Sequence, residues 1–204
     1  MEILKIIDKL KSKRKVFYSE SDFQFALAWE IQTYYPNAYI RLEYPLNKEY
    51  MDIRVELDNK IYPIELKYKT KSLTVEDNDE TYCLKNQGAQ DIGRYDYLKD
   101  VQRIEQFLKE KDYECGYAIL LTNDKLYWSE NKRENNIDAQ FCLNDGVEKT
   151  GKLKWSEKTG EGTKKGRENG IILKGKYKIN WNEYSNFGKK NDEFKYCLNV
   201  IKKS

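Results

Sequence analysis

Two carboxylates and one ammonium group lie on the segment from Met51 to Lys67, whose pattern is typical of a β-hairpin. Side chains alternate between the two faces of a strand, so Glu65 and Lys67 share the polar face of the second strand. A turn at Asp58-Asn59 would place Asp52 opposite Glu65, where like charges repel unless a cation or a shared proton offsets them. A divalent metal is the simplest offset. Carboxylates, a metal and a lysine together are what a metal-dependent phosphodiesterase needs.

This spacing resembles that of the PD-(D/E)xK nuclease superfamily, whose signature is an acid on one strand and an acid-x-Lys triplet on the next. The matching residues are Asp52 and Glu65-Leu66-Lys67, and Met51 stands in the place of the family's proline. The resemblance covers roughly residues 20–128. It implies a restriction-endonuclease-like fold, an α/β (α+β) core in the order αβββαβ with a mixed central sheet flanked by helices.

For the site, the resemblance implies that Asp52, Glu65 and the backbone carbonyl of Leu66 hold Mg²⁺, for which Mn²⁺ can substitute. Mg²⁺ is a hard ion that prefers oxygen ligands and keeps several waters. Lys67 would orient the attacking water and stabilise charge on the scissile phosphate. The alternative is a solvated hairpin with a charged outer face, because a chain with 35% charged residues produces this spacing by chance.

A helix is predicted before the hairpin, capped by Ser19 or Ser21 and ending near Tyr35. Glu30 lies next to its apolar stripe, where an unpaired carboxylate is costly to bury, so we expect Glu30 to point toward the metal cleft as the helix-borne acid. An ion pair at the edge of the core is the alternative for this residue. Glu20 is the rival for the role, although an acid at a helix start also suits the helix dipole. The apolar stripe consists of Phe23, Leu27, Ile31 and Tyr34.

A second helix is predicted from near Gln90 to about Lys111, after a polar stretch from Thr70 to Asn86 that we interpret as a loop or an excursion over the cleft. The resemblance implies that Gln90 and Arg94 on this helix hold a phosphate; the alternative is a solvated charged face. The apolar run Gly116 to Leu121 predicts a buried strand, with Lys125 to Trp128 as its hairpin partner.

The chain changes composition near residue 130, which predicts a nuclease core over 1–130 and a β-rich, basic elaboration over 131–204 packed on it. Lys149 to Lys178 holds ten Lys or Arg against three acids. Phosphates are attracted to such a surface, so we predict nucleic-acid contacts here, although lysines also simply solvate a sheet. The residues predicted for these contacts are Lys164, Lys165, Arg167 and Lys176. The predicted strands are Phe141–Leu143, Lys152–Trp155, Ile171–Trp181 and Phe194–Ile201.

The absence of histidine excludes His-based triads, HExxH zinc sites and HNH-type nucleases. The four cysteines are scattered without a CxxC pair, which argues against a cysteine zinc site or a disulfide framework and favours a reducing cytoplasm. No apolar run approaches 18 residues, so no membrane partner is expected. The first 15 residues predict a short amphipathic docking helix with a basic end.

The function predicted from the sequence is hydrolysis of phosphodiester bonds in DNA, with RNA left open as a substrate. Two alternatives are a nucleic-acid-binding protein of the same fold without catalysis and a protein-interaction module, which the net charge of +3 permits. Many members of the superfamily dimerise to cut both strands, so a homodimer is expected by analogy alone. Sequence preference and endo- or exonuclease action depend on loops that the fold does not dictate.

Overall fold

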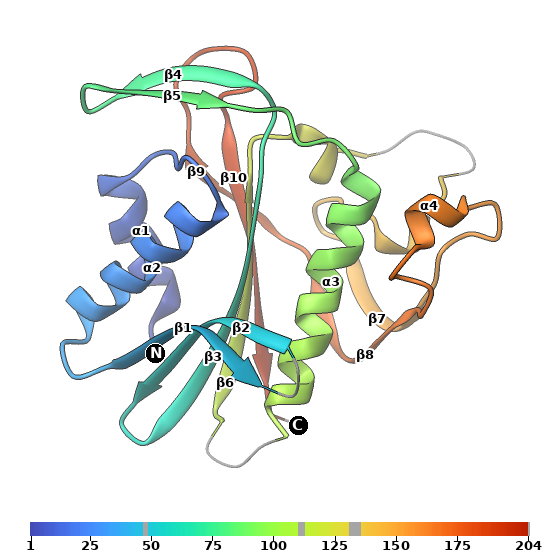
Figure 1. The fold of residues 1–204 in the computed structure, drawn as a ribbon, viewed down its shortest axis with the longest axis horizontal. Helices are drawn as coiled ribbons and strands as arrows, with labels where there is room; N and C mark the ends of the chain where they lie inside the picture. The colour runs from blue at the N-terminus through green and yellow to red at the C-terminus, as the bar shows by residue number, and fades with distance from the viewer. Residues whose placement is uncertain (47–48, 110–112, 131–135, 204) are drawn as a thin grey trace.

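The computed structural model describes residues 1–46, 49–109, 113–130 and 136–203. A six-stranded sheet runs through the middle, with two helices on one face and one long helix on the other (Figure 1). None of the described helices is long and apolar enough to cross a membrane. In chain order the elements are α1 (Ile3–Lys13), α2 (Glu20–Tyr34), β1 (Tyr39–Leu46), β2 (Glu49–Leu57), β3 (Lys60–Lys69), β4 (Leu73–Asp77), β5 (Glu80–Leu84), α3 (Gln90–Phe107), β6 (Cys115–Thr122), β7 (Glu148–Leu153), α4 (Glu161–Lys164), β8 (Ile171–Lys178), β9 (Trp181–Ser185) and β10 (Phe194–Lys202), with 3₁₀ turns at Lys125–Tyr127 and Ala139–Phe141.

The central sheet has the strand order β1-β2-β3-β6-β10-β9 and is mixed. Strands β3 and β6 are parallel, as expected where a helix, here α3, joins them; the other neighbours are antiparallel. Two apolar clusters cover the two faces. One gathers the buried side chains of α1 and α2, and the other those of α3 and the β7-β8 ribbon. The expectation of a mixed sheet flanked by helices is confirmed.

The β2-β3 hairpin has the register that the alternation predicts. Leu57 pairs with Lys60 and Ile53 with Ile64. Asp58 and Asn59 form the two-residue turn, with φ of 52° and 59°. Two successive positive φ angles are the signature of a type I′ turn, whose twist matches that of the strands. The apolar residues of the hairpin lie in the cluster of α1 and α2, whereas Glu65 and Lys67 contact α3.

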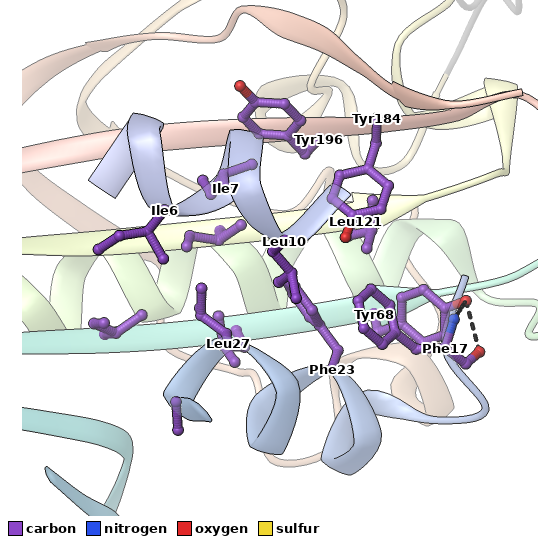
Figure 2. Close-up of a cluster of buried hydrophobic side chains, with 14 of the residues drawn as sticks. Ile6, Ile7, Leu10, Phe17, Phe23, Leu27, Tyr68, Leu121, Tyr184 and Tyr196 are labelled. Atoms are coloured by element: carbon purple, nitrogen blue, oxygen red, sulfur yellow. Dashed lines mark hydrogen bonds between the residues drawn. The ribbon is translucent and has the colours of Figure 1, made fainter. Parts of the chain in front are cut away.

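Helix α2 begins where the cap residue predicts. The Ser19 side chain accepts a hydrogen bond from the backbone N–H of Asp22. Phe23, Leu27 and Ile31 are buried against α1 and the sheet. Figure 2 shows Phe23 and Leu27 beside Leu10 of α1 and the ring of Tyr68. The N-terminal amphipathic segment is thus part of the main core, with Ile3, Ile6, Ile7 and Leu10 buried.

Three predictions of local structure were wrong. The stretch Thr70 to Asn86 contains the hairpin β4-β5, not a loop, and its Asn78-Asp79 turn has positive φ at both residues. Residues 125–127 form a 3₁₀ turn, and the antiparallel partner of β6 is β10. The predicted strand Phe141–Leu143 coincides with the end of the second 3₁₀ turn. Each of these strands and turns is too short for periodicity alone to decide between turn and strand.

The C-terminal part of the chain divides between two places. Strands β9 and β10 belong to the central sheet, whereas β7 and β8 form a separate ribbon whose buried side chains join the cluster of α3. The predicted elements Lys152–Trp155 and Ile171–Trp181 overlap β7, β8 and the start of β9. The predicted boundary near Glu130 to Asn136 falls mostly outside the described residues.

Replacing Leu27 with Ala tests the α2 core, because its side chain is 0% exposed. We expect the free energy of unfolding to fall by about 2–5 kcal/mol, from lost apolar burial and the cavity left behind. Urea unfolding followed by circular dichroism measures it. The matched control is Leu4→Ala on α1, whose side chain is 54% exposed and whose loss should cost under about 1 kcal/mol. Equal losses in both variants would contradict this packing.

Candidate active site

The candidate site lies where β2 separates from β3. The β2-β3 ladder runs from Leu57 to Ile53, whereas β3 continues beside β6 as far as Lys69. Beyond the ladder, carboxylates occupy the free edge of β3. The backbone N–H of Leu66 donates to Asp52 Oδ2 at 2.6 Å, and that of Tyr68 donates to Glu20 Oε2 at 2.7 Å. Backbone donors at a buried edge need partners, and here two acids supply them.

A distortion in the neighbouring strand accompanies this separation. Between β1 and β2 the pairs are Leu42 with Ile53 and then Tyr44 with Met51, and Glu43 between them has a φ of +48°, in the left-handed region. Gln24 of α2 fixes the distortion, because its Nε2 donates to Glu43 Oε1 and to the Asp52 carbonyl, both at 2.7 Å. The Asp52 carboxylate therefore reaches β3 instead of standing in a regular cross-strand pair.

The Tyr68 side chain brings the start of α2 to the same edge. Its hydroxyl donates to the Phe17 carbonyl at 2.9 Å, the dashed line in Figure 2, and accepts from the Phe17 backbone N–H at 3.4 Å. Phe17 precedes the Ser19 cap by two residues, so this contact fixes the approach of the helix to β3. Glu20, in the first turn of α2, thereby meets the backbone of Tyr68.

On the α3 side of the sheet, two residues of the helix contact the hairpin pair. Lys67 Nζ lies 2.7 Å from Asp100 Oδ2 and 3.0 Å from the carbonyl of Leu66. Arg103 Nη2 lies 3.2 Å from Glu65 Oε1, and Arg103 Nη1 lies 3.5 Å from Asp100 Oδ1. Asp52, Glu65 and Lys67 are thus brought together with two charged residues of α3.

Glu65 is the most unusual group of the site. Its side chain is 0% exposed, and neither carboxylate oxygen has a hydrogen-bond donor among the described residues, although Arg103 lies within ion-pair distance. Burial raises the pKa of Glu65 well above its usual value, and the charges of Asp100 and Asp52 raise it further. Burial also raises the pKa of Asp52, against the opposing charge of Lys67. Two acids that repel each other in a buried place favour a cation between them.

The charge state of Lys67 follows from its neighbours. Burial alone would lower the pKa of the ammonium, but the carboxylates of Asp100, Glu20 and Asp52 outweigh it and raise the pKa above the ordinary value. Lys67 is therefore a cation at neutral pH and cannot serve as a general base. Burial raises the pKa of its partner Asp100, against the opposing charge of Lys67.

The donors present fit a hard divalent cation. Glu65 has two oxygens without hydrogen bonds, Asp52 has one oxygen beyond the Leu66 contact, and the Leu66 carbonyl lies at the same edge. No group of three or more acids, cysteines or histidines close enough to hold a metal is found in the described part of the chain. Mg²⁺ commonly takes only one or two carboxylates, with water and phosphate completing its shell.

Of the two helix-borne acids considered, the structure brings only Glu20 to the site. Glu30 is 3% exposed, and its Oε2 lies 2.6 Å from Lys13 Nζ at the contact between α1 and α2. Ten residues of helix separate the two acids, which is about 15 Å. The prediction that Glu30 points toward Asp52 and Glu65 was therefore wrong. Glu30 instead forms an ion pair at the edge of the core, with Lys13.

The two α3 residues predicted for phosphate contacts have internal partners instead. Arg94 is 4% exposed, with its Nη1 2.5 Å from Asp138 Oδ2 and its Nη2 2.5 Å from the Leu126 carbonyl. Gln90 Nε2 donates to Asp124 Oδ2 at 2.8 Å. A guanidinium buried against an acid holds the 3₁₀ segments to α3 and presents no charge at the surface.

The four basic residues predicted in the C-terminal part differ in their exposure. Lys165 is exposed, and the Lys176 side chain is 75% exposed with its nearest acid at 4.0 Å. Arg167 is 28% exposed and bonds Asp96 at 3.0 Å, whereas Lys164 is 24% exposed. Lys165 and Lys176 therefore present their charge at the surface, and Arg167 ties the segment after α4 to α3.

Sequence reasoning identified neither Asp100 nor Arg103 as part of the site. A signal for Asp100 was present, because it lies three residues after Tyr97 and four before Ile104 on the buried stripe of α3. A charged residue on such a stripe requires a buried partner.

No family model, curated protein or solved structure matches this chain.

The raised pKa of Glu65 predicts a stability effect with a definite sign. In the unfolded chain a glutamate loses its proton near pH 4.3, whereas folded Glu65 keeps it to higher pH, so the parent loses stability as the pH rises through this interval. We expect Glu65→Gln to gain stability relative to the parent between pH 4 and pH 7, measured by urea unfolding in EDTA. Glu56→Gln, at a side chain 44% exposed, is the control. A Glu65→Gln difference that does not change with pH would contradict the argument.

Proposed function

We propose that this chain is a metal-dependent nuclease that hydrolyses phosphodiester bonds of DNA, with RNA as the second substrate to test. The observation that carries the proposal is the buried Glu65 carboxylate without hydrogen bonds, beside Asp52 and Lys67. The element order α2-β1-β2-β3-α3-β6 supports it, because it follows the αβββαβ order that the PD-(D/E)xK resemblance implies. The hairpin β4-β5 is an insertion in this order, between β3 and α3.

Asp52, Glu65 and the Leu66 carbonyl would hold the Mg²⁺ ion, and Mn²⁺ could replace it. When bound, the ion would polarise the phosphate and lower the pKa of a coordinated water. The carboxylates contribute the negative charge that attracts the ion, and the hydrogen bond from Leu66 N–H fixes one oxygen of Asp52. Leu66 O accepts one hydrogen bond, from Lys67, and its second lone pair could serve the ion.

Lys67 would act as a fixed positive charge. Its ammonium is protonated for the reasons given above, so it can donate hydrogen bonds to the attacking water and to a phosphate oxygen but cannot remove a proton. Asp100 keeps the ammonium on the α3 side of β3, 2.7 Å from its own Oδ2. Glu20, which accepts from Tyr68 N–H, has one further oxygen with which to orient a metal-bound water.

Removing either proposed ligand should abolish cleavage without unfolding the protein. We expect Asp52→Ala and Glu65→Ala each to lower the rate of DNA cutting by at least about 100-fold, because the one proposed carboxylate ligand that remains would bind a divalent ion weakly. Linear, circular and single-stranded DNA and RNA are incubated with Mg²⁺, Mn²⁺ or EDTA, and cutting is scored on gels. Glu56→Ala on the same hairpin is the matched control and should cut like the parent.

The same experiment separates the other functions. A parent protein that retains DNA but never cuts it would favour a binding protein without catalysis, and one that neither binds nor cuts would favour a protein-interaction module. Both ligand variants cutting at the parent's rate would show that the site is elsewhere. The homodimer expectation stays a prediction, which light scattering of the purified protein tests.

The exposed lysines of the C-terminal part should contribute to binding through charge alone. We expect Lys176→Gln to weaken DNA binding to a similar degree for all sequences and to reduce the slope of log K against log salt by about 1. Fluorescence anisotropy at several salt concentrations measures this. Lys60→Gln at the start of β3 is the control, with a side chain 51% exposed and paired to Glu114. Equal slopes for Lys176→Gln and the parent would remove this residue from the interface.

A further inference from the structure

Arg103 joins three carboxylates from three elements. Its Nε lies 3.1 Å from Glu49 Oε2 at the start of β2, Nη2 lies 3.2 Å from Glu65 Oε1 on β3, and Nη1 lies 3.5 Å from Asp100 Oδ1 on α3. It also donates to the Tyr50 carbonyl. Its side chain is only 15% exposed, so these contacts form in a partly desolvated place where charge interactions are strong.

The guanidinium contacts a carboxylate oxygen that a divalent cation would use as a ligand. Arg103 makes the one ion pair found for Glu65 among the described residues, and it approaches the oxygen without hydrogen-bond geometry. A guanidinium at this distance neutralises part of the charge that would attract the ion. It would also lie within a few ångströms of a metal bound to the same carboxylate, and two cations so close repel strongly.

We infer that Arg103 competes with the divalent ion for Glu65 and so determines the metal affinity of the site. This inference rests on the proposed function. In the metal-free protein Arg103 is the counter-ion of Glu65. When the ion binds, Arg103 gives up Glu65 and keeps Glu49, Asp100 and the Tyr50 carbonyl, which hold it nearby. The freed Nη2 group can then donate to a phosphate oxygen of the substrate, which a guanidinium suits well.

The arrangement makes the affinity for metal depend on substrate. A phosphate near the site offers Arg103 a new negative partner in place of Glu65, and the carboxylate becomes available to the ion. The apparent affinity for a ligand is the intrinsic affinity multiplied by the fraction of molecules in which the site is open, so anything that unblocks the site restores the intrinsic affinity. Nucleic acid and metal are therefore expected to bind with positive coupling, and Arg103 is the residue through which they do so.

The test is calorimetric titration of the full chain with Mn²⁺ at pH 8 in the absence of nucleic acid, which reads binding and not cleavage. We expect Arg103→Met to bind Mn²⁺ at least about 10-fold more tightly than the parent, and Arg103→Lys, which keeps the charge, to bind within about 3-fold of the parent. Circular dichroism checks that each variant is folded. Arg103→Gln, which keeps donors without charge, replaces the Met variant if that variant does not fold.

The outcomes separate this inference from the proposed function. If Glu65→Gln binds Mn²⁺ as the parent does, the proposed metal site is wrong. If Glu65→Gln abolishes binding but the uncharged Arg103 variants bind no more tightly than the parent, the site stands and the competition by Arg103 is refuted. Equal tightening in the Lys and Met variants would likewise refute it, because the effect would then not depend on charge.

Discussion

The free edge of β3 is the constraint on which the site depends. Once β2 turns away, the backbone N–H groups of Leu66 and Tyr68 lose their ladder partners, and a buried donor without an acceptor is costly. Asp52 and Glu20 supply the acceptors. The acids are thus fixed by the needs of the backbone, at a point where their charges also become available for chemistry.

The charges of the site balance only through helix α3. Glu65, Asp52 and Glu20 would repel one another in a buried place, and Lys67 and Arg103 offset them, with Asp100 linking the two cations. Burying charged groups without excellent pairing is expensive. Glu65 nevertheless has no hydrogen-bond donor in the described structure, although apolar clusters cover both faces of the sheet around it. A buried carboxylate without hydrogen bonds lowers stability, and such unfavourable groups are typical of functional sites.

Much of the hairpin could be predicted from sequence because its determinants are local. The turn at Asp58-Asn59 and the alternation of Ile53, Val55 and Leu57 fix register within a few residues, and Ser19 caps α2 by a contact three residues away. The choice between Glu20 and Glu30 could not be made, because both positions suit a helix. It depends on how α2 docks, which the distant contact between Tyr68 and Phe17 decides.

The strands that neighbour β6 could not be predicted from the sequence either. An apolar run such as Gly116 to Leu121 indicates a buried strand, but not which strands lie beside it, and β10 comes more than 70 residues later. Asp100 was detectable as a charge on an apolar stripe, yet its partner Lys67 lies on another element. Pairings over such distances are set by the packing of the whole sheet, which periodicity does not encode.

The late position of β10 in the chain bears on how the protein is made. Strand β10 lies between β6 and β9, so the edge of β6 stays open during synthesis until residues 194–202 have left the ribosome. An open edge of apolar strand invites pairing with other chains. The growing polypeptide therefore passes through a vulnerable interval, and a premature stop before β10 would leave an aggregation-prone fragment in place of a shortened, folded protein.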